Sequence, residues 1–501
     1  MRILKSSPLL LRMALAAMLG LVAALGLAPY EVWPLTLVSL AAVPFLIRYS
    51  RGSWRAAWIG WAYGTGYFAL ALSWIVEPFF VDAARDAWLA PFALMSMAGG
   101  LSLFWGLAFG LARVFSGSGA TRTGLLILFW TLAEIARGYI LTGFPWAAPA
   151  QIWTSTPVLP LLAWTGPQGL TLITLFVALS LSLIAAPGPR RFLALLPGLA
   201  LLVATLMVAP PQEIEMTGKT VRLVQPNAPQ DQKWDPDFMP VFFNRQIEYT
   251  AAGPRPDLIV WPEASLSSYV YGVEDPLAEL EQAAAGVPLA IGLLRPDEEG
   301  FYNSLAYFDQ AGDISQVYDK HHLVPFGEYI PFGGLLDGLG IQAIADISAG
   351  GMKSGPGPEL LDLGGLGKAL PLICYEAVFP QDVNRAEGRA SFLLQVTNDA
   401  WFGSGSGPYQ HLAQARMRAA EQSLPMIRVA NTGVSAMIDP YGRIIGSLPL
   451  GTAGYIDLPL PNPLEPSFYS RTGDLVALFV TLLGIVGVSM RSVFIKALKK
   501  D

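Results

Sequence analysis

Residues 370–378 of the chain read LPLICYEAV, and this stretch carries Cys374, the only cysteine among 501 residues. A short apolar run that ends in Cys-Tyr-Glu predicts a buried strand that stops at the thiol. A single cysteine cannot form an intramolecular disulfide, so the thiol is either an inert core side chain or a reactive group. Only the neighbouring motifs can decide between these two interpretations.

The composition predicts a membrane protein. Hydrophobic residues make up 53% of the chain, charged residues only 14%, and the mean hydropathy is +0.45. An ordinary soluble domain contains about 25% charged residues. The net charge of −6 and the lack of a basic run before the C-terminal lysines predict no nucleic-acid partner.

About eight apolar segments can form helices that cross a bilayer, which takes about 20 residues each. Seven of them precede residue 210, and one closes the chain. Their approximate bounds are 9–28, 33–48, 54–76, 88–114, 123–141, 157–186, 192–209 and 475–498.

The basic residues between these segments predict their orientation. They fall on one side of the predicted bundle, at Arg2, Lys5, Arg12, Arg48, Arg51, Arg55, Arg113, Arg122, Arg190, Arg191, Arg491, Lys496, Lys499 and Lys500. Because positive charge accumulates on the cytoplasmic face, both termini are expected inside and the long segment after span seven outside. In a bacterium this describes a multi-pass inner-membrane protein with a periplasmic domain.

The chain is therefore expected to divide into a transmembrane domain, 1–211, a catalytic domain, 212–472, and a final span with a short tail, 473–501. The middle part has the composition and length of one α/β domain. Short apolar runs predict its strands at 220–224, 258–260, 289–294, 370–373 and 391–396, and helical spacing predicts helices at 275–285 and 409–423. Turn sequences predict two hairpins, one around 310–313 and one around 440–442.

Three motifs place reactive groups at strand ends. Glu263 follows the run 257–262, Lys320 follows a hairpin and precedes Glu328 by eight residues, and Cys374 ends its own strand. A carboxylate, an amine and a thiol are the parts of an activated nucleophile. Glu263 can take the thiol proton, and Lys320 with the Tyr375 N–H can stabilise an oxyanion.

Each of these residues also has an ordinary interpretation. Glu263 could cap a helix, Lys320 could be a surface lysine, and Glu328 could be its structural ion-pair partner. It is the combination that favours a catalytic site.

The motifs WPEAS (261–265), YDKHHLVPFGEYIP (318–331), ICYEAVFP (373–380) and VTNDAWFG (396–403) resemble the nitrilase superfamily with its Glu-Lys-Cys triad. Together with the apolar segments they resemble the apolipoprotein N-acyltransferase family. Residues 68–75, 134–138 and 142–146 look like that family's span motifs, so the resemblance covers nearly the whole chain.

The resemblance implies a polytopic α-helical membrane protein with an inserted, extracytoplasmic, nitrilase-like αββα sandwich. It implies that Cys374 takes an acyl chain from a phospholipid, typically phosphatidylethanolamine, and that the resulting thioester passes it to the α-amine of a diacylglyceryl-cysteine at an apolipoprotein N-terminus. Glu263, Lys320 and Cys374 would be catalytic, with Glu328 orienting Lys320. No cofactor is implied, and a monomer is expected.

Five further residues are expected around this triad. Tyr375 and Glu376 are expected to support the oxyanion or position substrate, and Trp234 to bind substrate. Trp401 and Phe402 are expected to bind substrate as part of a lid at the membrane surface, with plain domain core as the alternative.

Glu134 and Arg137, three residues apart in span five, are interpreted as a structural pair near its outer end, with a headgroup contact as the alternative.

Competing functions have weaker support. A Cys-His protease would need an imidazole beside Cys374, but the sequence around Cys374 matches neither the caspase nor the papain signature. Metal binding by His321 and His322 is disfavoured, since neighbours on an extended strand point to opposite faces. A transporter should show broken helices or repeated halves, and the sequence indicates neither. A membrane-anchored amidase for a small amide is the leading alternative.

Overall fold

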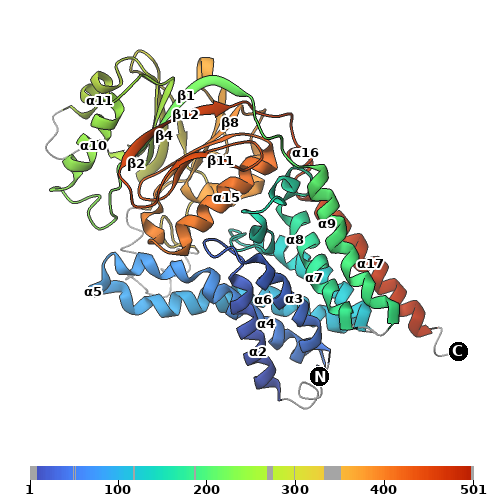
Figure 1. Cartoon of the computed structure of the whole chain (residues 1–501). Coiled ribbons are helices and arrows are strands. Elements are labelled where there is room, and N and C mark those ends of the chain that lie inside the picture. The colour runs from blue at the N-terminus through green and yellow to red at the C-terminus, as the bar shows by residue number, and fades with distance from the viewer. Residues whose placement is uncertain are drawn as a thin grey trace. The chain divides into compact units, whose positions relative to one another are not determined.

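The computed structural model describes residues 8–48, 50, 52–116, 119–185, 188–267, 275–297, 300–331 and 351–497. The chain forms two compact units (Figure 1). The first comprises Met1–Pro210, Gly405–Ala413 and Ser467–Asp501, and the second comprises Pro211–Ser404 and Gln414–Pro466. Five of the basic residues used to predict the orientation, Arg2, Lys5, Arg51, Lys499 and Lys500, lie outside the described residues.

The first unit is helical, and each predicted apolar segment contains a helix. These helices are α2 (Leu9–Ala24), α3 (Trp33–Ile47), α4 (Ser53–Ala71), α6 (Ala90–Phe115), α7 (Gly119–Tyr139), α8 (Leu162–Ser180), α9 (Leu196–Met207) and α17 (Leu475–Ala497). Two short helices, α5 (Ala83–Asp86) and α16 (Phe468–Thr472), complete the α-helices described for this unit apart from the start of α15.

By length and composition, two described helical segments, Ala83–Phe115 and Leu159–Ala185, could each cross a membrane. A third span results if Ser53–Ala71 and Ser73–Phe80, which bend by 48°, act as one. The segments Leu9–Ala24, Trp33–Ile47, Arg191–Met207 and Leu475–Met490 are apolar but shorter. Helices at the predicted positions are thus confirmed, and a count of eight spans stays a prediction.

Glu134 and Arg137 of α7 are both buried inside the first unit. Arg137 donates to both carboxylate oxygens of Glu134, at 3.1 and 2.5 Å, and to the carbonyls of Phe144 and Trp146. Trp105 also donates to Glu134, at 2.7 Å. This pair is therefore satisfied by the protein itself, as the structural interpretation predicts.

The second unit is built on two six-stranded sheets. The first has the order β12 (Gly454–Pro461), β1 (Met216–Gln225), β2 (Leu258–Ser267), β3 (Leu289–Asp297), β4 (Gly300–Phe308) and β5 (Ile314–Asp319). The second has the order β11 (Ile444–Leu448), β10 (Ser435–Ile438), β9 (Met426–Ala430), β8 (Phe392–Thr397), β7 (Lys368–Ile373) and β6 (Leu361–Asp362). The central pairs are parallel in both sheets: β1–β2 and β2–β3 in one, β7–β8 and β8–β9 in the other.

The two sheets pack face to face. One buried cluster joins Val260 and Leu305 of the first sheet to Phe392 and Ile427 of the second. The outer face of the first sheet is covered by α10 (Met239–Ala251) and α11 (Pro276–Ala284), which lie side by side on it (Figure 1).

On the second sheet, every residue of β8 and β9 is buried, so this sheet is covered on both faces. Helix α14 (Pro380–Arg385) follows the cysteine strand, and Arg418 of α15 (Ser406–Gln422) donates to the carbonyl of Val378 beside it. The layers therefore run helix, sheet, sheet, helix.

All five predicted strands, both helices and both hairpins of this unit are confirmed, with ends that differ by a few residues. Five α-helices and strands of this unit were not predicted: α10, β6, α14, β9 and β12. Strand β9 has the sequence MIRVA, in which a buried arginine, Arg428, interrupts the apolar run. Arg428 is paired with Asp399 at 2.5 Å, so tertiary contacts overrule the local pattern.

Candidate active site

Cys374 stands at the end of β7, as the sequence predicts. Its φ of +50° turns the chain sharply from the strand into a short 3₁₀ helix, Cys374–Val378. The residue is 5% exposed. Burial, followed by the negative charge of Glu263, raises the pKa of the thiol, while Lys320 and a hydrogen bond with Thr397 act in the opposite direction. The thiol is therefore protonated at rest, and a nucleophilic attack needs a base.

Glu263 lies in a bulge of β2 rather than past the end of that strand. The register of β2 against β3 shifts between Trp261 and Leu266, and Ala264 has a φ of +48°. Gly292 of β3 makes this bulge possible, because a Cβ there would lie 2.4 Å from the Pro262 carbonyl oxygen and 2.6 Å from the Glu263 Cα. The bulge aims the carboxylate inward instead of leaving it at a strand terminus.

Both oxygens of Glu263 accept hydrogen bonds. Asn303 Nδ2 donates to Oε1 at 2.7 Å, and the backbone N–H of Asn398 donates to Oε2 at 2.7 Å. These bonds fix the carboxylate in one orientation.

Lys320 follows β5 directly and has a side chain that is 1% exposed. Its ammonium lies 2.8 Å from Glu328 and 3.8 Å from Glu263. Burial alone would lower the pKa of Lys320, but the charges of Glu328, Glu263 and Cys374 raise it above its usual value. Lys320 is therefore a permanent cation.

Glu263, Lys320 and Cys374 thus meet in one buried place, although 111 positions separate the first from the last (374 − 263). Each influences the charge of the others. Glu328, the predicted partner of Lys320, also accepts from the backbone N–H of Val324 at 2.7 Å and is thereby held in place.

Glu376 faces the protein rather than open space. One of its oxygens accepts from the Tyr318 hydroxyl at 2.9 Å and the His321 N–H at 2.8 Å, and the other accepts from the Ile373 N–H at 2.7 Å. It therefore ties the loop after Lys320 to the turn that carries Cys374. Tyr375 packs its ring edge-on against His322 and Phe379.

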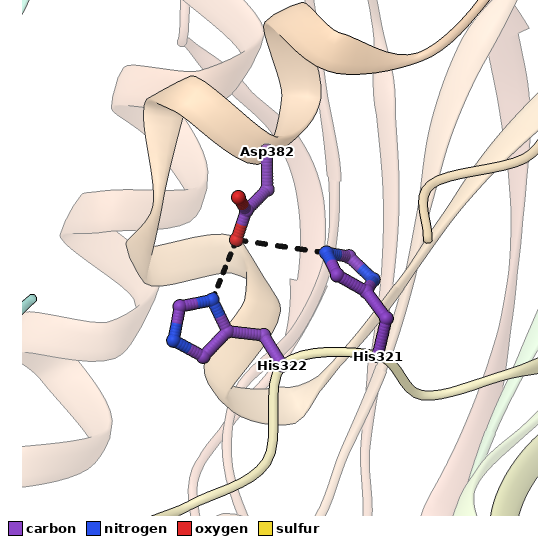
Figure 2. A group of neighbouring side chains, drawn as sticks. All are labelled: His321, His322 and Asp382. Atoms are coloured by element: carbon purple, nitrogen blue, oxygen red, sulfur yellow. Dashed lines mark hydrogen bonds and ion pairs between the residues drawn. The ribbon is translucent and has the colours of Figure 1, made fainter. Parts of the chain in front are cut away.

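His321 and His322 both turn toward Asp382 of α14 (Figure 2). Asp382 Oδ2 lies 2.6 Å from His322 Nδ1 and 3.6 Å from His321 Nε2. The prediction that these adjacent histidines point to opposite faces is wrong, because they lie in a loop rather than on a strand.

This group has the donor types of a metal site, yet its geometry is that of a hydrogen-bonded network. Two ligands of tetrahedral zinc lie about 3.3 Å apart, given bonds of about 2.0 Å. The 2.6 Å contact is shorter and fits a hydrogen bond to a carboxylate. Burial lowers the pKa of His321, but the nearby carboxylates of Asp382 and Glu376 outweigh this and raise it to about 9. Burial raises the pKa of Asp382, but the two histidines lower it to about 2.

The three predicted substrate-binding aromatic residues differ in their surroundings. Trp234 and Trp401 are about two-fifths exposed, and Phe402 packs against the core cluster between the sheets. Trp234 lines a cavity of about 30 Å³ together with Lys233, Phe242 and Ala264. Phe402 is only partly buried, so substrate binding as part of a lid stays a prediction.

Sequence reasoning missed three residues that contact Glu263: Lys233, Asn303 and Asn398. Lys233 Nζ donates to the Glu263 carbonyl at 3.0 Å. Asn398 stands inside the motif VTNDAWFG, and Lys233 directly precedes Trp234, so these neighbours are the signal that the sequence offered. Asn303 lies in β4, and the sequence pattern of this strand gives no sign of a contact with Glu263.

Comparison with known proteins covers both units. The carbon-nitrogen hydrolase family matches residues 220–462, and the apolipoprotein N-acyltransferase N-terminal domain matches residues 19–180. Among solved structures, a CN-hydrolase superfamily protein from Xanthomonas campestris matches with a TM-score of 0.35 and 19% identity, over 53% of this chain and 96% of its own.

Curated relatives match over nearly the full length. Apolipoprotein N-acyltransferase from Rhodopseudomonas palustris is 37% identical over 96% of this chain and 95% of its own. The enzymes of the same name from Brucella melitensis and Caulobacter vibrioides are each 36% identical, over 96% and 95% of this chain and 95% and 94% of their own. The chain therefore belongs to the apolipoprotein N-acyltransferase family.

Proposed function

We propose that this protein transfers an acyl chain from a phospholipid to the α-amine of the N-terminal diacylglyceryl-cysteine of apolipoproteins. The observation that carries this proposal is the buried convergence of Glu263, Lys320 and Cys374 in a chain that matches the named relatives over nearly its whole length. An amidase for a small amide shares the triad but not the match of the helical unit.

The first half-reaction makes a thioester. As Cys374 Sγ attacks the sn-1 ester carbonyl, its proton passes to Glu263, because the raised pKa of the thiol keeps it protonated until then. Lys320 and the backbone N–H of Tyr375 stabilise the oxyanion. When the intermediate collapses, the departing glycerol oxygen takes the proton from Glu263 and leaves as lysophospholipid.

The second half-reaction reverses these roles. The free α-amine attacks the thioester carbonyl, Glu263 accepts the amine's proton, and the proton then passes to the departing sulfur. An amide forms and the thiol of Cys374 is restored. Glu328 keeps Lys320 in place during both steps, and Glu376 and Tyr375 position the cysteine turn.

The helical unit supplies the membrane location. Leu107, Leu206, Met207 and Phe479 are more than half exposed on their helices, and such apolar surface fits contact with lipid. We propose eight spans, domains at 1–211, 212–472 and 473–501, cytoplasmic termini and a catalytic domain in the periplasm of a bacterial inner-membrane protein. Phosphatidylethanolamine as donor, a monomeric state, substrate binding by Trp234, and substrate binding by Trp401 and Phe402 as part of a lid belong to the same proposal, which uses no metal or cofactor.

Trapping the acyl-enzyme tests the function. Detergent-solubilised protein incubated with acyl-labelled phosphatidylethanolamine should acquire label that hydroxylamine removes. Cys374→Ala and Cys374→Ser should acquire none, since a serine hydroxyl is a far poorer nucleophile here. Adding a diacylglyceryl-peptide should move the label to its amine. Turnover of small amides without any lipid adduct would instead establish the amidase.

A further inference from the structure

Lys233 is a second buried lysine beside the triad. It is 7% exposed, and its ammonium donates to the Glu263 carbonyl at 3.0 Å and lies 5.2 Å from the centre of the Trp234 ring. Among the described residues the Glu263 carbonyl is its one hydrogen-bond acceptor. An ammonium that is buried with so few partners is costly, because its charge loses hydration.

The hydrogen bond alone does not explain a charge at this place. The bulge in β2 removes Glu263 from the sheet ladder, so its carbonyl needs a donor from elsewhere. A neutral amide could donate equally well and would cost less to bury. The hydrogen bond therefore does not explain why the residue at this position carries a positive charge.

The charged groups around Lys233 explain its positive charge. Lys233 interacts electrostatically with both Glu263 and Cys374. The site then contains two carboxylates, Glu263 and Glu328, and two ammonium groups, Lys320 and Lys233. When the thiol proton moves to Glu263, the negative charge moves to sulfur, and both cations act on it.

We propose that Lys233 is a positioning residue that fixes Glu263 through its carbonyl and stabilises negative charge on the Cys374 sulfur. This inference rests on the proposed role of Cys374 as the nucleophile. It adds to that role a second cation, which acts alongside Lys320.

Burial lowers the pKa of Lys233 to about 8, with Glu263 and Cys374 opposing the shift. These two are the ionisable groups that face it, and the described lining of the cavity beside it contains no other. The effect of its charge should therefore fade as the pH rises above about 8.

Alkylation by iodoacetamide tests the proposal on the full-length protein. Because Cys374 is the only cysteine, the mass of the intact chain reports on it alone. Lys233→Gln keeps a donor and removes the charge, whereas Lys233→Arg keeps both. At pH 7 we expect Lys233→Gln to react at least about tenfold more slowly than wild type, and Lys233→Arg to stay close to it.

The pH profile separates charge from structure. The ratio of wild type to Lys233→Gln should shrink above pH 8, and the ratio of Lys233→Arg to Lys233→Gln should persist, since arginine stays protonated. Lys219→Met, at a surface ion pair with Asp257, serves as the control and should match wild type. Rates that do not differ between wild type, Lys233→Gln and Lys233→Arg would overturn the proposal.

The assay contains no lipid. A protein that shows the expected pattern but forms no lipid adduct would disprove acyl transfer while keeping the role of Lys233. Normal lipid adducts together with equal alkylation rates would support acyl transfer and disprove the role of Lys233. A thermal unfolding curve of each variant shows whether it is folded.

Discussion

The Nζ atom of Lys320 lies 2.8 Å from Oε1 of Glu328, and the two side chains are only 1% and 12% exposed. A cation held this way cannot turn to follow another charge. Its position relative to Glu263 is set before any substrate arrives, which is what stabilisation of a developing oxyanion requires.

Glu328→Gln should therefore slow formation of the acyl-enzyme by about 100-fold, because Lys320 loses the charge that both holds it and raises its pKa. Single-turnover labelling by phospholipid measures this rate. Glu279→Gln, at an exposed position of α11, is the matched control. An unchanged rate in Glu328→Gln would show that Glu263 alone keeps Lys320 in place.

Asn303 should also affect this rate, although no sequence motif contains it. Its amide donates to Glu263 at 2.7 Å and to Glu328 at 3.3 Å, so it separates two carboxylates. Asn303→Leu keeps the branched shape of the side chain but removes this donor, and the same labelling rate should fall about tenfold. Asn244→Ala, exposed on α10, should have no effect. Equal loss in both variants would indicate general destabilisation.

The contacts of Glu376 predict that it acts through structure rather than by touching substrate. In Glu376→Gln one acceptor oxygen becomes an NH₂ that opposes an N–H donor of the Lys320 loop or of Ile373. We expect a lower kcat and a lower melting temperature, with an unchanged KM for phospholipid. A raised KM at constant kcat and stability would instead support the substrate-positioning role inferred from the family resemblance.

The sequence predicted the chemical groups of the site better than their supports. Lys320 and Cys374 stand at strand ends, which local patterns are enough to find, whereas Glu263 in the bulge of β2 and Glu328 in the loop after Lys320 were found through the motifs around them. Asn303 was not predicted because its partners, Glu263 and Glu328, lie 40 and 25 positions away in the sequence. No local pattern reports such contacts.

The fold was predicted only in part for the same reason: local patterns do not report contacts between residues that are far apart in the sequence. Strands with uninterrupted apolar runs were found, whereas β9 contains a buried arginine and β2 continues through Pro262 in a bulge. His321 and His322 were expected on opposite faces because an extended strand was assumed. The loop that contains them is set by Glu376 and Asp382, which stand more than 50 positions later.

The network of His321, Glu376 and Asp382 predicts a pH-dependent stability. The pKa of His321 is about 9 in the folded protein, above its ordinary 6.5, so its contribution is complete below pH 6.5 and is lost as the pH rises through 9. Asp382, with a pKa of about 2, contributes above pH 3.8 and loses its contribution only as the pH falls through 2.

The melting temperature of wild type minus that of His321→Asn should therefore be positive at pH 6 and fall by a few degrees toward pH 9.5. Taking the difference removes Lys233, whose lowered pKa acts with the opposite sign above pH 8. Differential scanning fluorimetry in detergent measures both proteins. A difference that stays constant with pH would show that folding does not shift the pKa of His321.

The last prediction concerns Glu134 and Arg137 in the helical unit. Because the guanidinium donates to Glu134 and to two backbone carbonyls, removing it leaves a buried carboxylate and unsatisfied carbonyls. Arg137→Met should destabilise the protein by about 3–5 kcal/mol, the typical cost of breaking a buried ion pair. Glu134→Leu combined with Arg137→Met should cost less than Arg137→Met alone, since no charge is then left unpaired.

The KM for phospholipid decides between a structural pair and a headgroup contact. Four of the five N–H groups of the guanidinium already donate within the protein, so a lipid phosphate could reach only the second hydrogen of Nη2 unless one of these bonds broke. The KM should therefore be the same in the double variant and in wild type, measured at a temperature where both are folded. A KM raised severalfold, with the melting temperature restored, would mean that Arg137 leaves Glu134 to bind the headgroup.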